Sequence, residues 1–180
     1  MGVASSVTNW ASFGVVLLLL HLYLGGMIFT HGFRKAFRGG RIEGTARWFE
    51  SIGMKPGKLN AYAASATEMG SGLLLTFGLL TSLACAALIA LMLVAIVCVH
   101  RKNGFMITNP GGGVEYCTLI AIAALALGTL GAGRFSLDHV WGLFNNWTPT
   151  ASFCVTLLIG FSGALLQLAL LYRPRNGRQM

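Results

Sequence analysis

Glu68 is the residue of this chain whose type and position most suggest chemistry, because it lies inside an apolar stretch. That stretch, Ala61 to Leu80, is long enough to cross a bilayer. A charged side chain at the centre of a membrane helix costs about 2.5 to 3.5 kcal/mol on insertion scales, so it is normally kept only where it faces protein, water or a ligand. Two more ionisable residues, His100 and Glu115, bracket the loop between the next two apolar stretches. Glu68 is therefore the lead candidate for a functional group.

The composition places the chain among integral membrane proteins. Hydrophobic residues make up 55% of its 180 residues and charged residues only 10%, with a mean hydropathy of +0.70. A soluble domain of this length would carry charge on about a quarter of its residues. We therefore predict an all-α fold, an integral membrane helical bundle that contacts membrane lipids.

Five apolar stretches each approach the ~20 residues that cross the hydrocarbon core of a bilayer. They are Phe13 to Thr30, Ala61 to Leu80, Leu83 to His100, Val114 to Ala132 and Ala151 to Tyr172. Only Thr81 and Ser82 separate the second stretch from the third, which predicts a tight helical hairpin with its turn at the membrane surface.

Basic residues in the connecting segments predict the orientation, because Lys and Arg near helix ends are retained on the cytoplasmic side. Twelve of the 13 fall on one side: Arg34, Lys35, Arg38, Arg41, Arg47, Lys55, Lys58, Arg101, Lys102, Arg173, Arg175 and Arg178. Only Arg134 falls on the other side, so the prediction is N-out and C-in. Topology and anionic lipid headgroups account for the net charge of +8, and nucleic acid is not a predicted partner.

The first long loop, residues 31 to 60, has an amphipathic composition. Its aromatic and aliphatic residues alternate with seven basic ones, a pattern typical of a segment that lies along the headgroups. Gly39 and Gly40 are predicted to break it into two pieces.

Small residues predict where the helices pack closely, because close backbone approach replaces the hydrophobic drive that lipid removes. Ala124, Gly128 and Ala132 form one such stripe, Gly160 and Ala164 another, and Gly25 and Gly26 could thin the first helix against a neighbour or a flat ligand. All four cysteines lie within predicted spans, without a C-x-x-C motif or a nearby histidine in ligand spacing, so no metal site is predicted.

Six polar residues project toward the cytoplasmic leaflet under this topology. They are His31, Lys35, Glu68, His100, Asn103 and Glu115. His100 ends the third predicted helix and Glu115 begins the fourth, so both could turn inward toward Glu68 and form a polar pocket. Asp138 and His139 face the opposite side and are excluded from it.

Over the first four predicted helices, the chain resembles the DoxX family of small bacterial membrane proteins. The resemblance rests on Gly32 with Lys35, Glu68-Met-Gly-Ser-Gly-Leu-Leu-Leu, Gly78-Leu-Leu-Thr81, His100 with Asn103-Gly104, Gly113 with Glu115, and Gly133 with Ser136-Leu-Asp138. It implies a multi-pass protein of the bacterial cytoplasmic membrane. Members of that family look like accessory subunits of quinone-linked oxidoreductases, among them thiosulfate:quinone oxidoreductase and a terminal quinol oxidase, or like partners of redox-defence enzymes.

A fifth helix departs from the usual four-span pattern of that family. We predict a DoxX-like four-helix domain over residues 1–135, including the interfacial loop. Residues 136–180 then hold an outer loop, the fifth helix and a basic tail. The additional helix suggests a docking surface for other subunits of a membrane redox complex.

The first functional hypothesis is a quinone or quinol site at the cytoplasmic leaflet. Glu68 or Glu115 would exchange protons there, since burial in apolar surroundings brings a carboxylate toward its neutral form. His100 or Lys35 would hydrogen-bond a quinone oxygen, and His31 and Asn103 complete the predicted cofactor-binding set.

Three other interpretations stay open on the sequence alone. In the first, the chain is a non-catalytic scaffold subunit that stabilises a larger membrane complex through lipid and helix contacts. Glu68 would then only pair with His100 or Lys35 to hold the helices together. A b-type haem would need two axial histidines at matching depth, and His21 and His100 differ by about half a helix. A proton-coupled transporter would use Glu68 as its proton site, but the five spans show no obvious inverted repeat.

Overall fold

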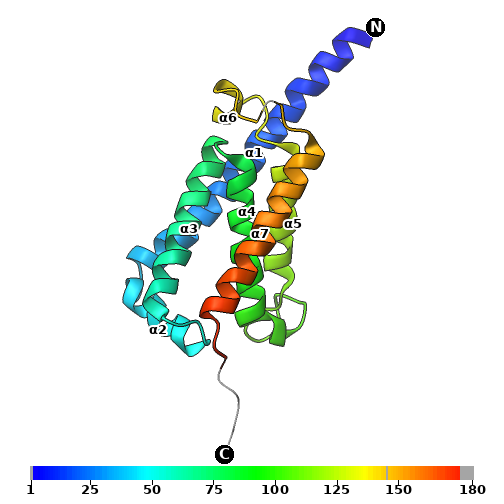
Figure 1. Cartoon of the computed structure of the whole chain (residues 1–180). Coiled ribbons are helices and arrows are strands. Elements are labelled where there is room, and N and C mark those ends of the chain that lie inside the picture. Colours follow the sequence, from blue (N-terminus) through cyan, green and yellow to red (C-terminus); the bar gives the residue numbers. More distant parts are fainter. Residues whose placement is uncertain (1, 145, 175–180) are drawn as a thin grey trace, which may run out of the picture.

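The computed structural model describes residues 2–144 and 146–174, with side chains from residue 11 onward, and shows a helical bundle (Figure 1). Its helices are α1 Gly2–Phe37, α2 Arg41–Ser51, α3 Gly57–Phe77, α4 Thr81–Ala95, η1 Ile96–His100, η2 Arg101–Asn103, α5 Glu115–Leu130, α6 Leu137–Val140 and α7 Pro149–Leu171. The α-helical membrane bundle predicted from composition is confirmed. We call the end with the α3–α4 turn the hairpin end, and the end with the basic residues the basic end.

Over the described residues, three helical segments are long and apolar enough by themselves to cross a membrane. They are Ala11–Phe37, Thr81–Asn103 and Pro149–Leu171, while α5 is apolar but shorter. The predicted span in α3 is not among them. The polar residues of α3 explain the difference, and they lie inside the bundle: Asn60, Ser65, Glu68 and Ser71 are all buried. The polar side of this helix is therefore covered by protein.

The first helix divides into a face toward the bundle and a face toward lipid. Leu17, His21, Leu24 and Ile28 recur every three or four residues and are buried. The opposite face exposes apolar side chains, namely Val15, Val16, Leu19, Leu20, Leu22 and Tyr23. This spacing fixes which side of α1 packs on α3.

Glycines let α1 and α3 approach backbone to backbone. A Cβ added to Gly72 would lie 2.6 Å from the backbone nitrogen of Phe29 and 2.7 Å from the carbonyl oxygen of Gly25. One added to Gly25 would lie 2.5 Å from the hydroxyl of Thr76, whereas Gly26 meets nothing within 4 Å. The close contact predicted for Gly25 is therefore made with α3, and Gly26 takes no part in it.

The predicted helical hairpin is present, but its turn lies three residues earlier than expected. α3 ends at Phe77, and Gly78 and Leu80 turn the chain with φ values of 58° and 49°. Thr81 and Ser82 are the first residues of α4 and are buried. Glycine at position 78 has no Cβ to strain this left-handed conformation, which explains the location of the turn.

The loop predicted to lie along the headgroups forms the end of α1, a short turn and α2. The break predicted at Gly39 and Gly40 is confirmed, since α1 ends at Phe37 and α2 begins at Arg41. Ala46 and Phe49 of α2 are buried, while Trp48 is 44% exposed. The helix therefore packs one side on the bundle and leaves an aromatic ring free on the other.

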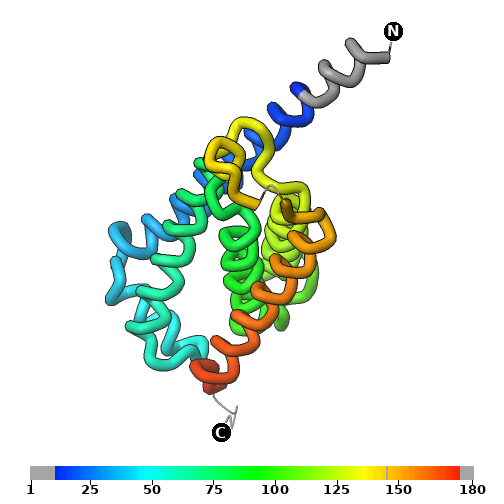
Figure 2. Tube along the Cα trace, turned by 45° about the horizontal axis from the view of Figure 1, so that its top comes forward, coloured from blue at the N-terminus to red at the C-terminus, as the bar shows by residue number. Residues whose placement is uncertain are grey.

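The fifth predicted helix, α7, is built into the bundle against α4 and α5 (Figures 1 and 2). Its buried residues, Ser152, Thr156, Gly160 and Ala164, recur every fourth position. A Cβ on Gly160 would lie 2.8 Å from Cγ2 of Ile89, so the small-residue stripe predicted here is confirmed. The domain division proposed at residue 135 stays a prediction.

The basic end of α7 is joined to the segment before α3. The backbone N–H of Lys55 donates to the carbonyl of Leu171 at 2.8 Å, and the N–H of Arg173 donates to the carbonyl of Gly53 at 2.7 Å. Met54, between them, is fully buried. The last helix is thus fixed to the first half of the chain.

Candidate functional site

The lead residue, Glu68, forms an ion pair with Lys35. Glu68 lies in the middle of α3 and Lys35 in the last turn of α1, with 2.5 Å between Nζ and Oε1. The carboxylate side chain is 4% exposed and the lysine side chain 30%. Gly32, one turn before Lys35, makes room for the contact, because a Cβ there would lie 2.8 Å from Cβ of Glu68. Of the two partners that the sequence left open for Glu68, the structure selects Lys35.

Two buried oxygens at this ion pair have no hydrogen-bond partner in the part of the chain that the structure describes. They are Oε2 of Glu68 and the hydroxyl of Ser65, which lies one turn earlier on the same side of α3. Buried polar atoms in proteins nearly always find a partner in protein or ordered water. The pair therefore has capacity to bind a water molecule or a ligand group.

A cavity of about 360 Å³ lies at the basic end, on the outer side of Lys35. Its lining residues are His31, Arg34, Lys35, Arg38, Gly39 and Thr45, from the end of α1 and the start of α2. The Thr45 hydroxyl donates to the Lys35 carbonyl at 3.0 Å, which holds α2 against α1. Lys35 thus lines the cavity and also contacts the buried carboxylate.

The other three predicted site residues stabilise the loop between η2 and α5. His100 Nδ1 lies 2.9 Å from the Gly112 carbonyl, and the Asn103 amide donates to the same carbonyl at 2.9 Å. The Glu115 carboxylate accepts from the backbone N–H of Ile107 at 2.8 Å. His100 also ends a π-helical turn, η1, which widens the helix just before this loop.

The predicted single pocket is therefore divided into two groups. Lys35 and Glu68 are in contact, with His31 in the adjoining cavity, while His100, Asn103 and Glu115 form a separate network. Among the described residues, no hydrogen bond or ion pair joins that network to Glu68. The direction of each side chain depends on loop hydrogen bonds that sequence spacing does not reveal.

Reasoning from the sequence missed the importance of Asp138 at the hairpin end. Its two carboxylate oxygens accept from the backbone N–H groups of Leu80 and Thr81, at 2.7 and 2.9 Å. Its own N–H donates to the Gly78 carbonyl at 2.9 Å. Asp138 therefore caps α4 from a distant segment and closes the α3–α4 turn. One signal in the sequence could have indicated this capping role. Asp138 follows the glycine-rich end of the fourth predicted span, on the same side of the membrane as the α3–α4 turn.

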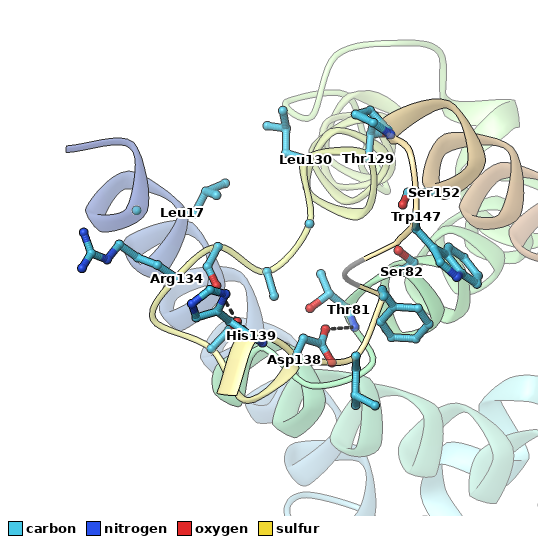
Figure 3. A pocket seen from close by; sticks show the side chains of 18 of the residues that line it. Leu17, Thr81, Ser82, Thr129, Leu130, Arg134, Asp138, His139, Trp147 and Ser152 are labelled. Atoms are coloured by element: carbon cyan, nitrogen blue, oxygen red, sulfur yellow. Dashed lines mark hydrogen bonds between the residues drawn. The ribbon is translucent and has the colours of Figure 1, made fainter. Parts of the chain in front are cut away.

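A second and larger cavity, of about 540 Å³, lies next to Asp138 (Figure 3). It is bounded by the first half of α1, the first turn of α4, the segment after α5 and the segment before α7. Arg134 and His139 also line it. Both cavities lie at ends of the bundle. Among the described residues, no three His, Cys, Asp or Glu side chains gather as a metal site would require.

Comparison with known proteins assigns the family. Residues 16–101, from α1 to the start of η2, match the DoxX family model. A protein of Bacillus subtilis named "Putative oxidoreductase CatD" is 36% identical over 128 residues, which cover 71% of this chain and 87% of that protein. The chain belongs to the DoxX family. A second relative, from Haemophilus influenzae and described as an uncharacterized protein, is 29% identical over 133 residues, 69% of this chain and 82% of its own length. No solved structure matches the chain.

Proposed function

We propose that this DoxX protein is an accessory subunit of a quinone-linked redox complex in the bacterial cytoplasmic membrane. The quinone head group would bind in the basic-end cavity. One observation carries the proposal: Lys35 lines that cavity and pairs with a carboxylate buried between two helices. The name of the Bacillus relative supports an association with oxidoreductase chemistry.

The polar residues of the cavity suit the oxygens of a quinone. Quinone oxygens accept hydrogen bonds, and both His31 and Lys35 carry donors at the cavity wall. The described lining contains no apolar side chain, so the contact would be with the polar edge of the head group. A bound quinone would supply two-electron chemistry that is coupled to proton uptake.

In this proposal the chain itself supplies groups that transfer protons and positive charges that stabilise an anionic ligand. The Lys35 ammonium donates a hydrogen bond toward the cavity or toward Glu68. The free Oε2 of Glu68 provides a second position for a proton. Arg34 and Arg38 favour negative charge that develops on a ligand. His100, Asn103 and Glu115 hold the loop between η2 and α5. The electron donor or acceptor is supplied by another subunit.

The proposal is tested by neutralising Glu68 in native membranes. We expect Glu68→Gln to lower quinone-linked turnover about tenfold or more, as loss of a proton-transfer group does, while the complex still assembles. The matched control is Glu43→Gln, because Glu43 is an exposed carboxylate that pairs with exposed Lys58 at 3.0 Å. Unchanged turnover in Glu68→Gln would remove the proton role.

Binding is tested separately with a photoreactive azidoquinone. Cross-linking to a peptide that contains residues 31–45, and competition by unlabelled quinone, would support the cavity. Cross-linking confined to other segments would contradict it.

A scaffold function without quinone chemistry is the second candidate. The observation that favours it is the same ion pair, since Lys35 and Glu68 also hold α1 against α3. Extraction in mild detergent, followed by a native gel and mass spectrometry, separates the two. If redox subunits are lost from the complex in Glu68→Gln, the pair acts in assembly. If they remain and only turnover falls, it acts in proton transfer.

A further inference from the structure

The larger cavity at the hairpin end takes no part in the proposed quinone site, and it runs from an exposed rim to a buried floor. Arg134, His139 and Trp147 are exposed at the rim, whereas Leu17 and Thr81 at the floor are each 1% exposed. The volume of about 540 Å³ has room for on the order of ten water molecules. The cavity therefore reaches from the surface of the bundle toward its interior.

Most polar groups of the floor already have partners in the protein. The Ser82 hydroxyl donates to the Gly128 carbonyl at 3.0 Å, the Ser136 hydroxyl donates to the Gly133 carbonyl at 2.6 Å, and Asp138 caps α4. The Thr81 hydroxyl is different, because its oxygen is buried and has no hydrogen-bond partner. In Figure 3, Thr81 lies between Asp138 and Ser82 at the edge of the open space.

His21 adds a second unpartnered atom just below this floor. It lies one helical turn from Leu17, on the same buried face of α1, and is 2% exposed. Its Nδ1 is 2.8 Å from the Leu75 carbonyl, in the last turn of α3. A carbonyl only accepts, so Nδ1 must carry the hydrogen, and in the neutral ring Nε2 then has a lone pair to offer. Within the described residues Nε2 has no hydrogen-bond partner of good geometry, and the backbone of Gly131, which lines the cavity, lies beside the ring.

We infer that the hairpin-end cavity is a water-filled vestibule and that His21 is a proton-exchange site at its inner end. Two buried atoms have no hydrogen-bond partner among the described residues. The Thr81 hydroxyl of α4 belongs to a residue that lines the cavity, and Nε2 of His21 lies one helical turn beyond Leu17, which also lines it. Ordered water usually satisfies such atoms. A histidine inside a membrane helix that contacts water exchanges protons with the compartment on that side.

The proton step balances with water alone. Nε2 of His21 takes a proton from hydronium and leaves a water molecule. Nδ1 keeps its hydrogen on the Leu75 carbonyl, and the ring becomes a cation. Asp138, Arg134 and His139 are the ionisable groups that the hairpin-end segments place at this cavity, with the Thr81 hydroxyl from α4 and the Leu75 carbonyl from α3. Both carboxylate oxygens of Asp138 accept hydrogen bonds from backbone N–H groups at the start of α4.

This inference is independent of the quinone proposal, which concerns the opposite end of the bundle. Glu68 lies seven residues before Leu75 on α3, a separation of about 10 Å along the helix. The chain would then hold one proton-exchanging group near each end, Glu68 from the basic end and His21 from the hairpin end. Failure of either assignment leaves the other standing, because different variants and different readouts test them.

Substituted cysteines test the water in the vestibule. We expect Leu17→Cys to react with a charged, membrane-impermeant methanethiosulfonate reagent at least about tenfold faster than Leu20→Cys, since only a hydrated thiol forms the reactive thiolate. Leu20 is the matched control, because it lies on the same helix and is 48% exposed on the lipid side. Site-resolved mass spectrometry keeps the native cysteines apart from the introduced one. Equal slow labelling at both positions would overturn the vestibule.

Hydrogen–deuterium exchange at the imidazole Cε1 tests His21 in the unmodified protein. We expect exchange at His21 that titrates with pH, at a rate within about tenfold of exposed His139, because both rings would contact the same water. Thr81→Val, which keeps the shape and removes the hydroxyl, should slow exchange at His21 and leave His139 unchanged. Absence of exchange at His21 under conditions where His139 exchanges fully would overturn the proton-exchange site.

Discussion

The buried ion pair is the residue-scale feature on which both function and stability depend. Glu68 is almost fully buried and Lys35 is its one charged partner among the described residues. A buried charge that loses its partner is strongly destabilising, whereas replacing both members with apolar groups is often neutral. The two effects can be separated by single and double substitutions.

We expect Lys35→Met to lower the free energy of unfolding by about 2 to 3 kcal/mol, less than for a fully buried pair because Lys35 is partly exposed. The double variant Lys35→Met/Glu68→Leu should recover most of that loss. Equilibrium unfolding in mixed lipid–detergent micelles measures the free energy of unfolding of the single and the double variant. A double variant as unstable as the single one would show that the pair stabilises the bundle by more than charge compensation.

Asp138 carries the second residue-scale prediction. Asp138→Ala should destabilise the hairpin end by about 1 to 3 kcal/mol, because two backbone N–H groups at the start of α4 lose their acceptor. Asp138→Asn keeps one acceptor oxygen and should have an intermediate effect. Amide exchange at Leu80 and Thr81 is the readout, with the start of α7 as an internal reference because Thr148 caps it independently. Unchanged protection in Asp138→Ala would contradict the capping role.

At this scale the sequence identified the important carboxylate but could not choose its partner. The cost of charge in lipid singled out Glu68, and helix spacing placed Lys35 at the right depth. Whether His100 turned toward Glu68 depended on the Gly112 carbonyl, twelve residues along the chain at the end of an irregular loop. Periodicity carries no information about such loop contacts, so that part of the site was not predictable.

At the scale of elements, close contact between α1 and α3 depends on glycine at specific positions. Gly72→Ala should destabilise the bundle by about 1 to 3 kcal/mol, because its Cβ would overlap the backbone of Phe29 and Gly25. Gly70→Ala is the matched control on the same helix, since nothing lies within 4 Å of its Cβ position. That change should be neutral or slightly stabilising. Thermal unfolding of the two variants measures the difference. An equal loss of stability in Gly72→Ala and Gly70→Ala would contradict the close contact between α1 and α3.

The helices themselves were largely predictable, and their ends were not. Apolar length gave all five long helices, and Gly39 with Gly40 gave the break before α2. The hairpin turn moved to Gly78 because a left-handed residue ends α3 there, and capping by Asp138 then draws Thr81 and Ser82 into α4. Hydropathy alone does not reveal a helix cap, such as Asp138, that a distant segment supplies.

At the scale of the whole molecule, the distribution of Lys and Arg predicts how the bundle sits in the membrane. Among the described residues, Lys and Arg gather at the end of the bundle opposite the α3–α4 turn, whereas Arg134 lies at the hairpin end. We expect a green fluorescent protein fused after the C-terminus to fluoresce, because it stays in the cytoplasm, and alkaline phosphatase inserted between Leu143 and Trp147 to be active outside it. The reverse pair of signals would invert the orientation.

The joining of α7 to the segment before α3 also sets an order of biosynthesis. Among the described helices α7 is synthesised last, so the carbonyl of Gly53 and the face of α4 around Ile89 stay uncovered until α7 inserts. A chain that stops before Pro149 would therefore expose these groups to lipid and to membrane proteases.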